Sequence, residues 1–395
     1  MSRVFETWEF AAQSTLNPTR VTLAAQSAKG KDPLAKASSL WQLYVILIRI
    51  TAIMSGPSLM SYQRVTQREV ARLAGVSQAT VSMVLSGVQG HSIPSETFAR
   101  VVQVARELGY VPNRFAQALK TKRTMTLACV VPDVANPFYP SLVRGIQSVA
   151  DTAEYDVIVI NTDGSPVREK RFLDWSLRGT IDGVVGVFFT LRAPDFAPLA
   201  QAGIGIVRIE TSGKREGPLP IDSLFVDNVA AAAAATRYLI QRGHRRIAMI
   251  AGVGGPEGKR TSGYLQALGE AGLTPQLASY GDFNEAGGYL ATQNILAASS
   301  RPTAIFAAND LMALGAMAAI REASLSIPDD VALIGFDDIF AARVVTPQLS
   351  TINQFQQTLG RVATEMVLQR LNELPRDVPG RQREMPFELV LRQSA

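Results

Sequence analysis

The order of apolar and polar positions divides the chain near residue 124. Before this point, apolar residues recur at helical spacing in three short segments; after it, short apolar runs alternate with longer amphipathic stretches. The runs lie at 126–131, 156–160, 183–188, 205–209, 246–251, 303–307 and 331–335. This alternation predicts parallel sheets with helices on both faces. Roughly 270 residues are better divided into two lobes than placed in one sheet.

The first of the three helical segments begins at Thr66. The Thr66 hydroxyl can cap the helix amides, and Glu69, three positions later, can complete a capping box. We predict that Val70, Leu73 and Ala74 form one buried stripe. The Ala-Gly-Val turn that follows supplies small residues, which let a second helix leave at a sharp angle.

The second helix starts after its predicted cap, Ser77. It packs through Val81, Val84 and Leu85, and its other face can enter a major groove. That face carries Gln78, Ala79, Ser82 and Met83. A third helix, from about Ser95, has an apolar stripe, so the three stripes can close one small core. The third stripe consists of Phe98, Val101, Val102, Ala105 and Leu108.

Charge points to a binding partner for this three-helix segment. Residues 61–123 hold nine Lys or Arg and three Glu, whereas residues 124–395 hold more acidic than basic residues. Positive charge is therefore concentrated where contacts to nucleic-acid phosphates are needed. The pattern favours a DNA-reading helix-turn-helix. The alternative is a small helical bundle with a solvated basic face.

Ordered motifs then run along the rest of the chain: VARLAGVSQATVSMVLSG, ELGYVPNRFAQALKT, NPFY, RGHRRIA, AANDLMALGAM and IGFDD. From about Val65 to the C-terminus they resemble the LacI/GalR-type transcriptional regulators. The resemblance implies an α/β fold, with a periplasmic-binding-protein-like core of two doubly wound lobes after a small all-α helix-turn-helix head. On this pattern 61–112 is the DNA-binding head, 113–123 a hinge helix and linker, and 124–395 the effector-binding and dimerisation domain.

The resemblance also implies that three crossovers join the two lobes. Lobe one would then comprise about 124–224 plus a return near 352–358. Lobe two would be mainly 225–350. The chain sequence leaves the exchanged C-terminal segments unassigned.

By resemblance, DNA-binding residues come from both the head and the hinge: Thr66, Ser77, Gln78, Ala79, Thr80, Ser82, Met83, Asn113, Arg114, Ala118, Leu119 and Lys120. Leu119 would wedge into the minor groove beside Lys120, since an apolar wedge can unstack a base step and bend the duplex. The alternative is that Leu119 packs against the core and Lys120 is solvated. Met83 departs from the family, which usually has Arg there. Methionine makes no bidentate guanine contact but can touch a thymine methyl.

A ligand in such a core binds between the lobes, at the carboxyl ends of the strands. Phe138 and Tyr139 open the helix after the first strand, and Asn309 and Asp337 follow two later strands. An aromatic ring there can stack on a sugar or a base, although a core aromatic at a helix start is the alternative. An amide and a carboxylate can hold neighbouring hydroxyls, and burial makes an unmatched ligand costly.

Other effector residues come from the family pattern alone. Arg260 matches an arginine that clamps the effector, Phe283 an aromatic lining the same cleft, and Gln354 a polar contact between the lobes. We expect Asp310 only to cap its helix and Asp338 only to cap or pair locally. The loop FTLRAP lacks the acidic residue that other family members carry there, which leaves the polarity of the ligand open.

Catalysis finds little support in the sequence. The two histidines, His91 and His244, lie in separate segments, so no His-based triad or metal cluster is evident, and we expect no cofactor. The loop GVGGPEGKR does not fit the phosphate-binding pattern GxxxxGK[ST]. A single cysteine, Cys129, excludes an intrachain disulfide and suggests a buried strand thiol in a cytoplasmic protein.

Residues 1–60 fit none of these patterns. The apolar stretch 40–54 is short for a membrane span and contains Arg49. A signal or anchor and a disordered or partner-binding arm are two interpretations. We favour a third, in which translation begins at Met60 and residues 1–59 are an upstream extension. A peptide from 1–59, recovered by mass spectrometry of the natively expressed protein, excludes the third.

The combined prediction is a transcriptional regulator, by expectation a repressor, that binds a pseudo-palindromic operator as a dimer. A sugar, sugar acid, polyol or nucleobase in the cleft would change its affinity for double-stranded DNA. Without terminal leucine heptads, we expect a dimer rather than a coiled-coil-tethered tetramer. The alternative class is a solute-binding protein without DNA function. Neither the sign of the effector response nor the operator sequence follows from the chain.

Overall fold

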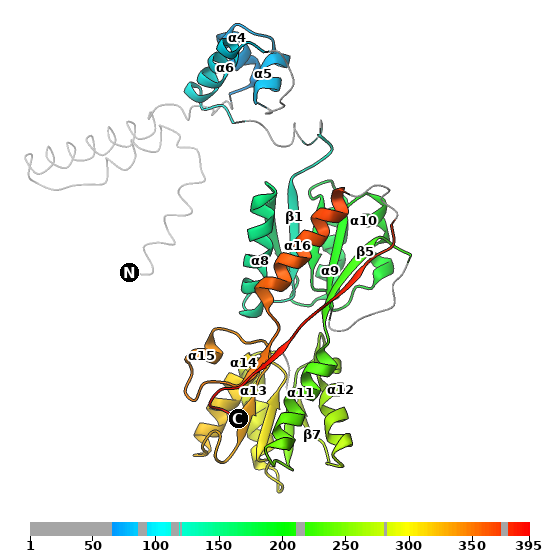
Figure 1. Cartoon of the computed structure of the whole chain (residues 1–395), viewed down its shortest axis with the longest axis vertical. Coiled ribbons are helices and arrows are strands. Elements are labelled where there is room, and N and C mark those ends of the chain that lie inside the picture. The colour runs from blue at the N-terminus through cyan, green and yellow to red at the C-terminus, as the bar shows by residue number, and fades with distance from the viewer. Residues whose placement is uncertain are drawn as a thin grey trace, which may run out of the picture. The chain divides into compact units, whose positions relative to one another are not determined.

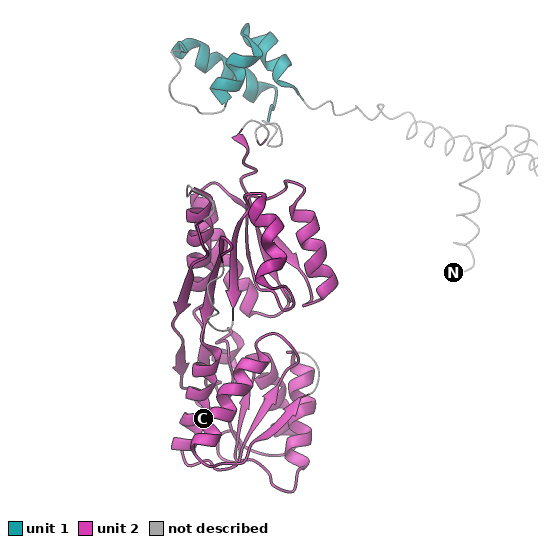
Figure 2. Ribbon diagram, turned by 90° about the vertical axis from the view of Figure 1, so that its right-hand side faces the viewer, with its two compact units in different colours: residues 1–112 teal, residues 113–395 magenta. Residues whose placement is uncertain are grey.

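The computed structural model describes residues 65–85, 93–111, 118, 121–210, 218–279, 283–372 and 378–395. It divides into two compact units, residues 1–112 and 113–395 (Figure 2). The predictions made for residues 1–60 and for four hinge residues lie outside the described residues. Those four are Asn113, Arg114, Leu119 and Lys120.

Three helices form the described part of the first unit: α4 (Gln67–Ala74), α5 (Gln78–Leu85) and α6 (Ser95–Glu107). The predicted capping box at the start of α4 is confirmed. The amide of Glu69 donates to the Thr66 hydroxyl at 3.4 Å, and the amide of Thr66 donates to the Glu69 carboxylate at 2.8 Å. This reciprocal pair satisfies two helix-end donors and fixes where α4 begins.

The turn between α4 and α5 also follows the prediction. Gly75 has a φ of +64°, a left-handed conformation that glycine adopts without steric cost. The hydroxyl of Ser77 then accepts a hydrogen bond from the amide of Thr80 at 3.1 Å, so Ser77 caps α5 as expected.

The core of this unit differs from the predicted one at two apolar positions. Leu73 is 50% exposed and Phe98 is 48% exposed, although both were expected to be buried. Ala71 takes the place of Leu73 beside Val70, which rotates the buried stripe of α4 by one position. The remaining core residues are Val70, Ala71, Ala74, Val81, Val84, Val101 and Ala105.

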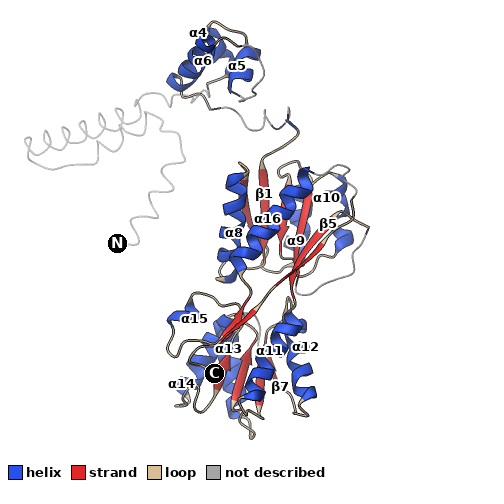
Figure 3. Ribbon diagram, in the orientation of Figure 1, coloured by secondary structure: helices blue, strands red, loops and turns tan. Residues whose placement is uncertain are grey.

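The second unit contains two lobes, each built on a parallel sheet (Figures 1 and 3). Lobe 1 comprises residues 124–226 and 356–385, and its six strands lie in the order β11-β5-β4-β3-β1-β2. These strands are β1 (Thr126–Val131), β2 (Asp156–Asn161), β3 (Gly183–Gly186), β4 (Gly205–Glu210), β5 (Ile221–Val226) and β11 (Gln382–Met385).

Helices cover both faces of the lobe 1 sheet. Alternate residues of β1 point to opposite faces and therefore pack in different clusters. Leu127, Cys129 and Val131 pack with α8 (Phe138–Thr152) and α16 (Gln356–Asn372). Ala128 and Val130 pack against the helices of the other face. Those helices are α9 (Pro166–Ser176), η2 (Ala193–Phe196) and α10 (Ala197–Gln201). Cys129 is buried, as predicted for a strand thiol.

Lobe 2 comprises residues 227–355 and 386–395 and repeats this plan around a sheet with fewer strands. Its sheet has the strand order β7-β6-β8-β9, with β6 (Ile247–Ala251), β7 (Gln276–Ser279), β8 (Ala304–Ala307) and β9 (Ala332–Ile334). An antiparallel pair joins β10 (Thr351–Asn353) to β12 (Glu388–Val390). The helices are α11 (Asn228–Gln241), α12 (Glu257–Glu270), α13 (Glu285–Ala297), α14 (Asp310–Glu322) and α15 (Ala341–Val344).

The chain crosses between the lobes three times: after β5, after β10 and after β11. The predicted boundary at 224 is therefore two residues early. The predicted return near 352–358 is much too short, because all of α16 and β11 belong to lobe 1. In Figure 1 the orange helix of this return, α16, packs against α8, β3 and β4, and its red strand, β11, pairs with β5.

Candidate effector cleft and DNA-binding head

A cavity of about 620 Å³ lies between the two lobes. It is lined by residues from strand ends, helix starts and the crossovers, as expected for open α/β sheets. All seven effector residues expected from the sequence line it: Phe138, Tyr139, Arg260, Phe283, Asn309, Asp337 and Gln354. The structure therefore brings together residues up to 216 positions apart in the chain.

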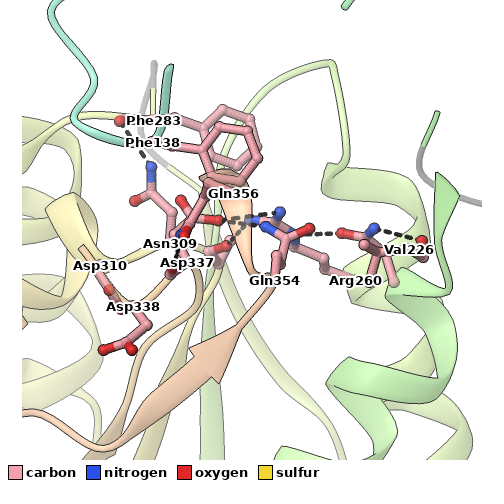
Figure 4. A network of polar contacts seen from close by, with 12 residues as sticks. Phe138, Val226, Arg260, Phe283, Asn309, Asp310, Asp337, Asp338, Gln354 and Gln356 are labelled. Atoms are coloured by element: carbon pink, nitrogen blue, oxygen red, sulfur yellow. Dashed lines mark hydrogen bonds and ion pairs between the residues drawn. The ribbon is translucent and has the colours of Figure 1, made fainter. Parts of the chain in front are cut away.

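Asp337 is the centre of the polar network in this cavity (Figure 4). Its carboxylate accepts from the Gln354 amide at 2.7 Å and pairs with the Arg260 guanidinium at 3.5 Å. Burial raises the pKa of Asp337 to about 6, opposed by Arg260 and by the Gln354 hydrogen bond. The Gln356 side chain donates to the main-chain oxygen of Asp337. The side chain of Asp337 is therefore held from the crossover by Gln354, and its main chain is held from the first residue of α16.

Arg260, on α12, is fixed by four contacts and is only 5% exposed. Its Nε donates to Asn228 at 2.8 Å, its Nη1 donates to the Ala308 carbonyl, and its Cζ lies 3.7 Å from the centre of the Phe336 ring. With the Asp337 pair, these contacts hold the planar fork in one orientation. Arg260 is therefore a buried side chain of fixed orientation at the cavity wall rather than a mobile surface charge.

One prediction about the strand-end polar residues is wrong, because Asp310 does not cap its helix. Asn309, rather than Asp310, caps α14: its Oδ1 accepts from the Met312 amide at 2.8 Å, and its Nδ2 donates to the Phe283 carbonyl at 3.1 Å. Asp310 lies within the first turn and accepts from the Thr351 hydroxyl at 2.6 Å. An N-cap residue has an extended backbone, and Asn309 has this conformation. Asp310 is already the first residue of the helix.

Two further carboxylates near the network have structural partners. Asp338 pairs with Arg392 at 2.5 Å and with Arg343 at 3.4 Å, which confirms the expected local pairing. Burial and the neighbouring Asp337 carboxylate raise the pKa of Asp310 well above its ordinary value. The charge of Asp337 therefore disfavours the ionised form of Asp310.

The aromatic residues of the cavity also belong to the core. Phe138 and Tyr139 make an edge-to-face pair with ring centroids 5.1 Å apart, and both pack with α16. Phe283 lies against Gly252, where an added Cβ would come within 2.6 Å of the ring. The core-aromatic alternative and the effector-binding interpretation are thus compatible, because the same rings line the cavity.

Several lining residues escaped the sequence interpretation. Asn228 follows β5, whose apolar residues alternate and gave no continuous run. Glu210 ends β4 and pairs with Arg208 at 2.6 Å. The strand-end rule finds Glu210, because it directly follows the apolar run 205–209. The same rule would find Asn228 only if β5 had first been predicted as a strand.

A carboxylate from another part of the chain holds the backbone of the FTLRAP loop. The fully buried carboxylate of Glu169, on α9, accepts from the amides of Phe189, Thr190 and Leu191 at 2.7 to 3.0 Å. It also accepts from the Thr190 hydroxyl at 2.5 Å. This distant carboxylate fixes the loop backbone at the edge of the cavity.

The predicted DNA-reading face lies on α5 of the first unit. Gln78 and Ala79 are exposed, and Thr80, Ser82 and Met83 are partly exposed. The buried side of the same helix consists of Val81 and Val84. Ala118, the one described residue of the predicted hinge stretch 113–120, is partly buried.

Arg123 does not contribute to the basic surface in the way its charge suggested. Its guanidinium donates to the Leu371 carbonyl at 2.6 Å and to the Tyr155 hydroxyl at 3.0 Å. The next two residues are tied to lobe 1 as well, because the amides of Thr124 and Met125 donate to Asp182 at 2.7 and 3.0 Å. The linker therefore joins the core at Arg123.

Two searches of the described residues bear on other classes of protein. No described helix has the length and apolar character needed to cross a lipid bilayer. Within the same residues, no cluster of three or more His, Cys, Asp or Glu side chains has a geometry suited to a metal ion.

Comparisons with known proteins match both units. The family of bacterial regulatory proteins, lacI family, matches residues 66–113, and the periplasmic binding protein-like domain matches 236–395. HTH-type transcriptional regulator RegA of Clostridium saccharobutylicum is 34% identical over 336 residues, which cover 83% of this chain and 98% of that protein. The ribose operon repressor of Escherichia coli K12 is 34% identical, over 78% of this chain and 93% of that protein.

Solved structures of transcriptional regulators are also similar to this chain. The lac repressor dimer bound to operator and the anti-inducer ONPF has a TM-score of 0.75 at 28% identity, covering 84% of this chain and 99% of that one. The transcriptional regulator CelR–cellobiose complex has a TM-score of 0.61 at 28% identity, covering 84% of this chain and 100% of that one. With relatives above 30% identity matched over nearly their whole length, the chain belongs to the lacI family of bacterial regulatory proteins.

Proposed function

We propose that this protein is a ligand-responsive, sequence-specific DNA-binding regulator of transcription, acting as a repressor in the cytoplasm. The observation that carries the proposal is the presence, in one chain, of a capped helix-turn-helix and a two-lobed cavity whose polar centre is preformed. Relatives that match both parts are named as repressors, and two solved relatives hold a small molecule or an operator. The proposal contains no catalytic step.

In the head, α5 would enter the major groove and present Gln78, Ala79, Thr80, Ser82 and Met83 to base edges. Thr66 and Ser77, at the two helix starts, would contact phosphates, because helix N-termini offer donors to anions. The hinge residues Asn113, Arg114, Ala118, Leu119 and Lys120 would bind at the operator centre. A dimer would place two such heads on a pseudo-palindromic site.

In the cavity, Asp337, Arg260 and Gln354 would bind the effector hydroxyls, and Phe138, Tyr139 and Phe283 would pack on its apolar face. Asn309 would contribute the second N–H of its side-chain amide, since the first donates to the Phe283 carbonyl and the side-chain oxygen accepts from the Met312 amide. A buried carboxylate beside an arginine offers acceptors and donors to neighbouring hydroxyls. This chemistry supports a sugar or sugar derivative.

Effector binding would change DNA affinity by shifting the populations of two lobe arrangements. The helix α16 supports such a link, because its two ends contact the two places that must communicate. Gln356, at its start, holds Asp337 in the cavity, and Leu371, in its last turn, holds Arg123 at the entrance of the core. The effector must bind the two arrangements unequally for this link to act.

The test begins with selection of duplexes from a random library by the full-length chain. Fluorescence anisotropy over a salt series then measures affinity, which should fall steeply as salt rises because phosphate contacts release counterions. The matched control is the core alone, cut before Thr121 so that the Arg123 and Asp182 contacts stay intact. The core should lose DNA binding. A core that binds the selected duplex as tightly as the full chain would contradict the assignment of the head.

The ligand arm of the test is a thermal-shift screen of the same core against sugars, sugar acids, polyols and nucleobases. A bound ligand raises the unfolding temperature in proportion to the logarithm of its concentration over its Kd. A chain that bound a member of the panel but selected no duplex would instead be a solute-binding protein.

A further inference from the structure

Two loops from opposite lobes meet at the edge of the cavity. The first, 188–191, follows β3 in lobe 1, and the second, 252–256, follows β6 in lobe 2. Both loops line the cavity. The glycines of the second loop fit no phosphate-binding pattern, so their place in the fold needs another physical reason.

The ring of Phe189 is seated on a glycine from each lobe. A Cβ added at Gly255, in lobe 2, would lie 2.6 Å from the Phe189 Cζ, and one added at Gly164, in lobe 1, would lie 2.9 Å from its Cδ2. Real Cβ atoms do not approach other atoms so closely, so only glycine lets the ring contact both backbones. Phe189 therefore spans the boundary between the lobes by direct contact.

The ring is also held firmly from its own side. The amide of Phe189 donates to the Glu169 carboxylate at 2.7 Å, and the amides of Thr190 and Leu191 each donate to the same carboxylate at 3.0 Å. Glu169 is fully buried, so these charge-assisted hydrogen bonds are shielded from water. The backbone that carries the ring is thus part of the rigid body of lobe 1.

The glycine loop of lobe 2 seats a second ring in the same manner. Gly252 lies against Phe283, where an added Cβ would come within 2.6 Å of the ring. One short loop therefore receives one aromatic ring from each lobe: Phe283 from its own lobe and Phe189 from the other. Close approach of two rings, rather than contact with a phosphate, accounts for these glycines.

We propose that Phe189 is a latch that holds the two lobes together at the edge of the cavity and thereby sets how far the cavity opens without an effector. Removing the ring takes away a contact between the lobes and leaves the fold of each lobe intact, since Phe189 is only partly buried. The latch stands on contacts within the core alone. Its consequence for DNA affinity rests on the function proposed above.

The test measures the distance between two spin labels, one on each lobe of the full-length chain, by pulsed electron paramagnetic resonance. Labels are attached to Asp174→Cys on α9 and Gln266→Cys on α12, both exposed positions, while native Cys129 is fully buried. Phe189→Ala should move the distance distribution to longer values and broaden it. Phe189→Leu should have a smaller effect in the same direction. Phe340→Ala, which removes a ring that is 74% exposed, is the aromatic control and should change nothing.

A second pair of variants distinguishes the loss of the Phe189 contact from the backbone strain that alanine causes at a positive φ. Gly255→Ala should also lengthen the distance, because its Cβ would displace the ring. Gly254→Ala is the matched control: it has a φ of +79° against +58° for Gly255, but an added Cβ meets nothing within 4 Å. It should leave the distance unchanged. An unshifted distribution in Phe189→Ala, or equal shifts in the two glycine variants, would overturn the latch whether or not the protein binds DNA.

Discussion

Arg123 donates a hydrogen bond of 2.6 Å to the main-chain oxygen of Leu371 and so joins the entrance of the core to the last turn of α16. The other end of α16 is joined to the cavity, because the Gln356 side chain donates to Asp337. A helix of 17 residues is about 25 Å long at 1.5 Å per residue. Arg370 pairs with the buried Asp222 and fixes this helix to β5. One rigid element therefore connects the two regions.

The first prediction is that Arg123 and Gln356 are energetically coupled in operator binding. We expect Arg123→Ala and Gln356→Ala each to change the Kd for a selected duplex, and the double variant to depart from additivity by about 0.5–3 kcal/mol. Arg237→Ala, which breaks an exposed pair with Glu270, is the control and should add to Arg123→Ala. Additivity of Arg123 with Gln356 within about 0.5 kcal/mol would show that α16 does not transmit the signal.

The second prediction concerns the pH dependence of stability. The pKa of Asp337 is about 6 in the folded protein against an ordinary value of 3.8, so between these values the folded state keeps a proton that the unfolded state has lost. Stability from this proton is complete below pH 4 and is lost as the pH rises through 6. One pKa unit corresponds to about 1.4 kcal/mol, so the loss is about 3 kcal/mol.

Urea unfolding of wild type and Asp337→Asn from pH 4 to 7.5 measures this contribution. The free energy of unfolding of wild type should fall relative to the variant as the pH rises from 4 to 6. The Asp337 charge contributes to the raised pKa of Asp310, so the variant should also let Asp310 ionise at lower pH. A constant difference between the two proteins across this range would refute the assignment.

Much of the fold could be predicted because local pattern determines it. The seven apolar runs became seven of the parallel strands. Six of these strands are buried and therefore mainly apolar, whereas β2 is an edge strand that is apolar although Ile158 and Val159 are 41% and 40% exposed. Strand β5 alternates buried and half-buried residues, and β7 is an edge strand with exposed positions, so neither produced a run. The return of α16 to lobe 1 depends on packing against α8, more than 200 residues earlier, which no local window contains.

In the candidate site too, some features follow from local sequence and others depend on distant contacts. Strand-end position and family pattern were enough to bring seven residues to one cavity. Which of two adjacent polar residues caps a helix depends on the φ and ψ of each, so the sequence did not reveal that Asn309, rather than Asp310, caps α14. The bridging position of Phe189 depends on a buried carboxylate 20 residues earlier and a glycine in the other lobe. Neither relation has a signature in the sequence.

The third prediction is that a methyl group at Gly315 is strongly destabilising. Helices α13 and α14 are so close there that a Cβ at Gly315 would lie 1.9 Å from the Glu285 carbonyl oxygen. Forced overpacking of this kind costs about 1–3 kcal/mol or more. Gly269→Ala, in α12, is the control: nothing lies within 4 Å, and alanine should stabilise the helix by up to about 1 kcal/mol. Opposite shifts in thermal unfolding are expected, and equal shifts would contradict the helix contact.

The last prediction concerns Met83, on the face of α5 that is proposed to read base edges. Met83 lies where the family usually has an arginine suited to guanine, and a thioether side chain cannot form the bidentate contact. Met83→Arg should therefore select a guanine at one position of each outer half-site, with about 1–3 kcal/mol of discrimination against the other bases. Met83→Leu keeps an apolar side chain and should select the same sites as wild type. Parallel selections from one random library compare the three proteins, and identical preferred sites for wild type and Met83→Arg would show that this residue does not contact a base.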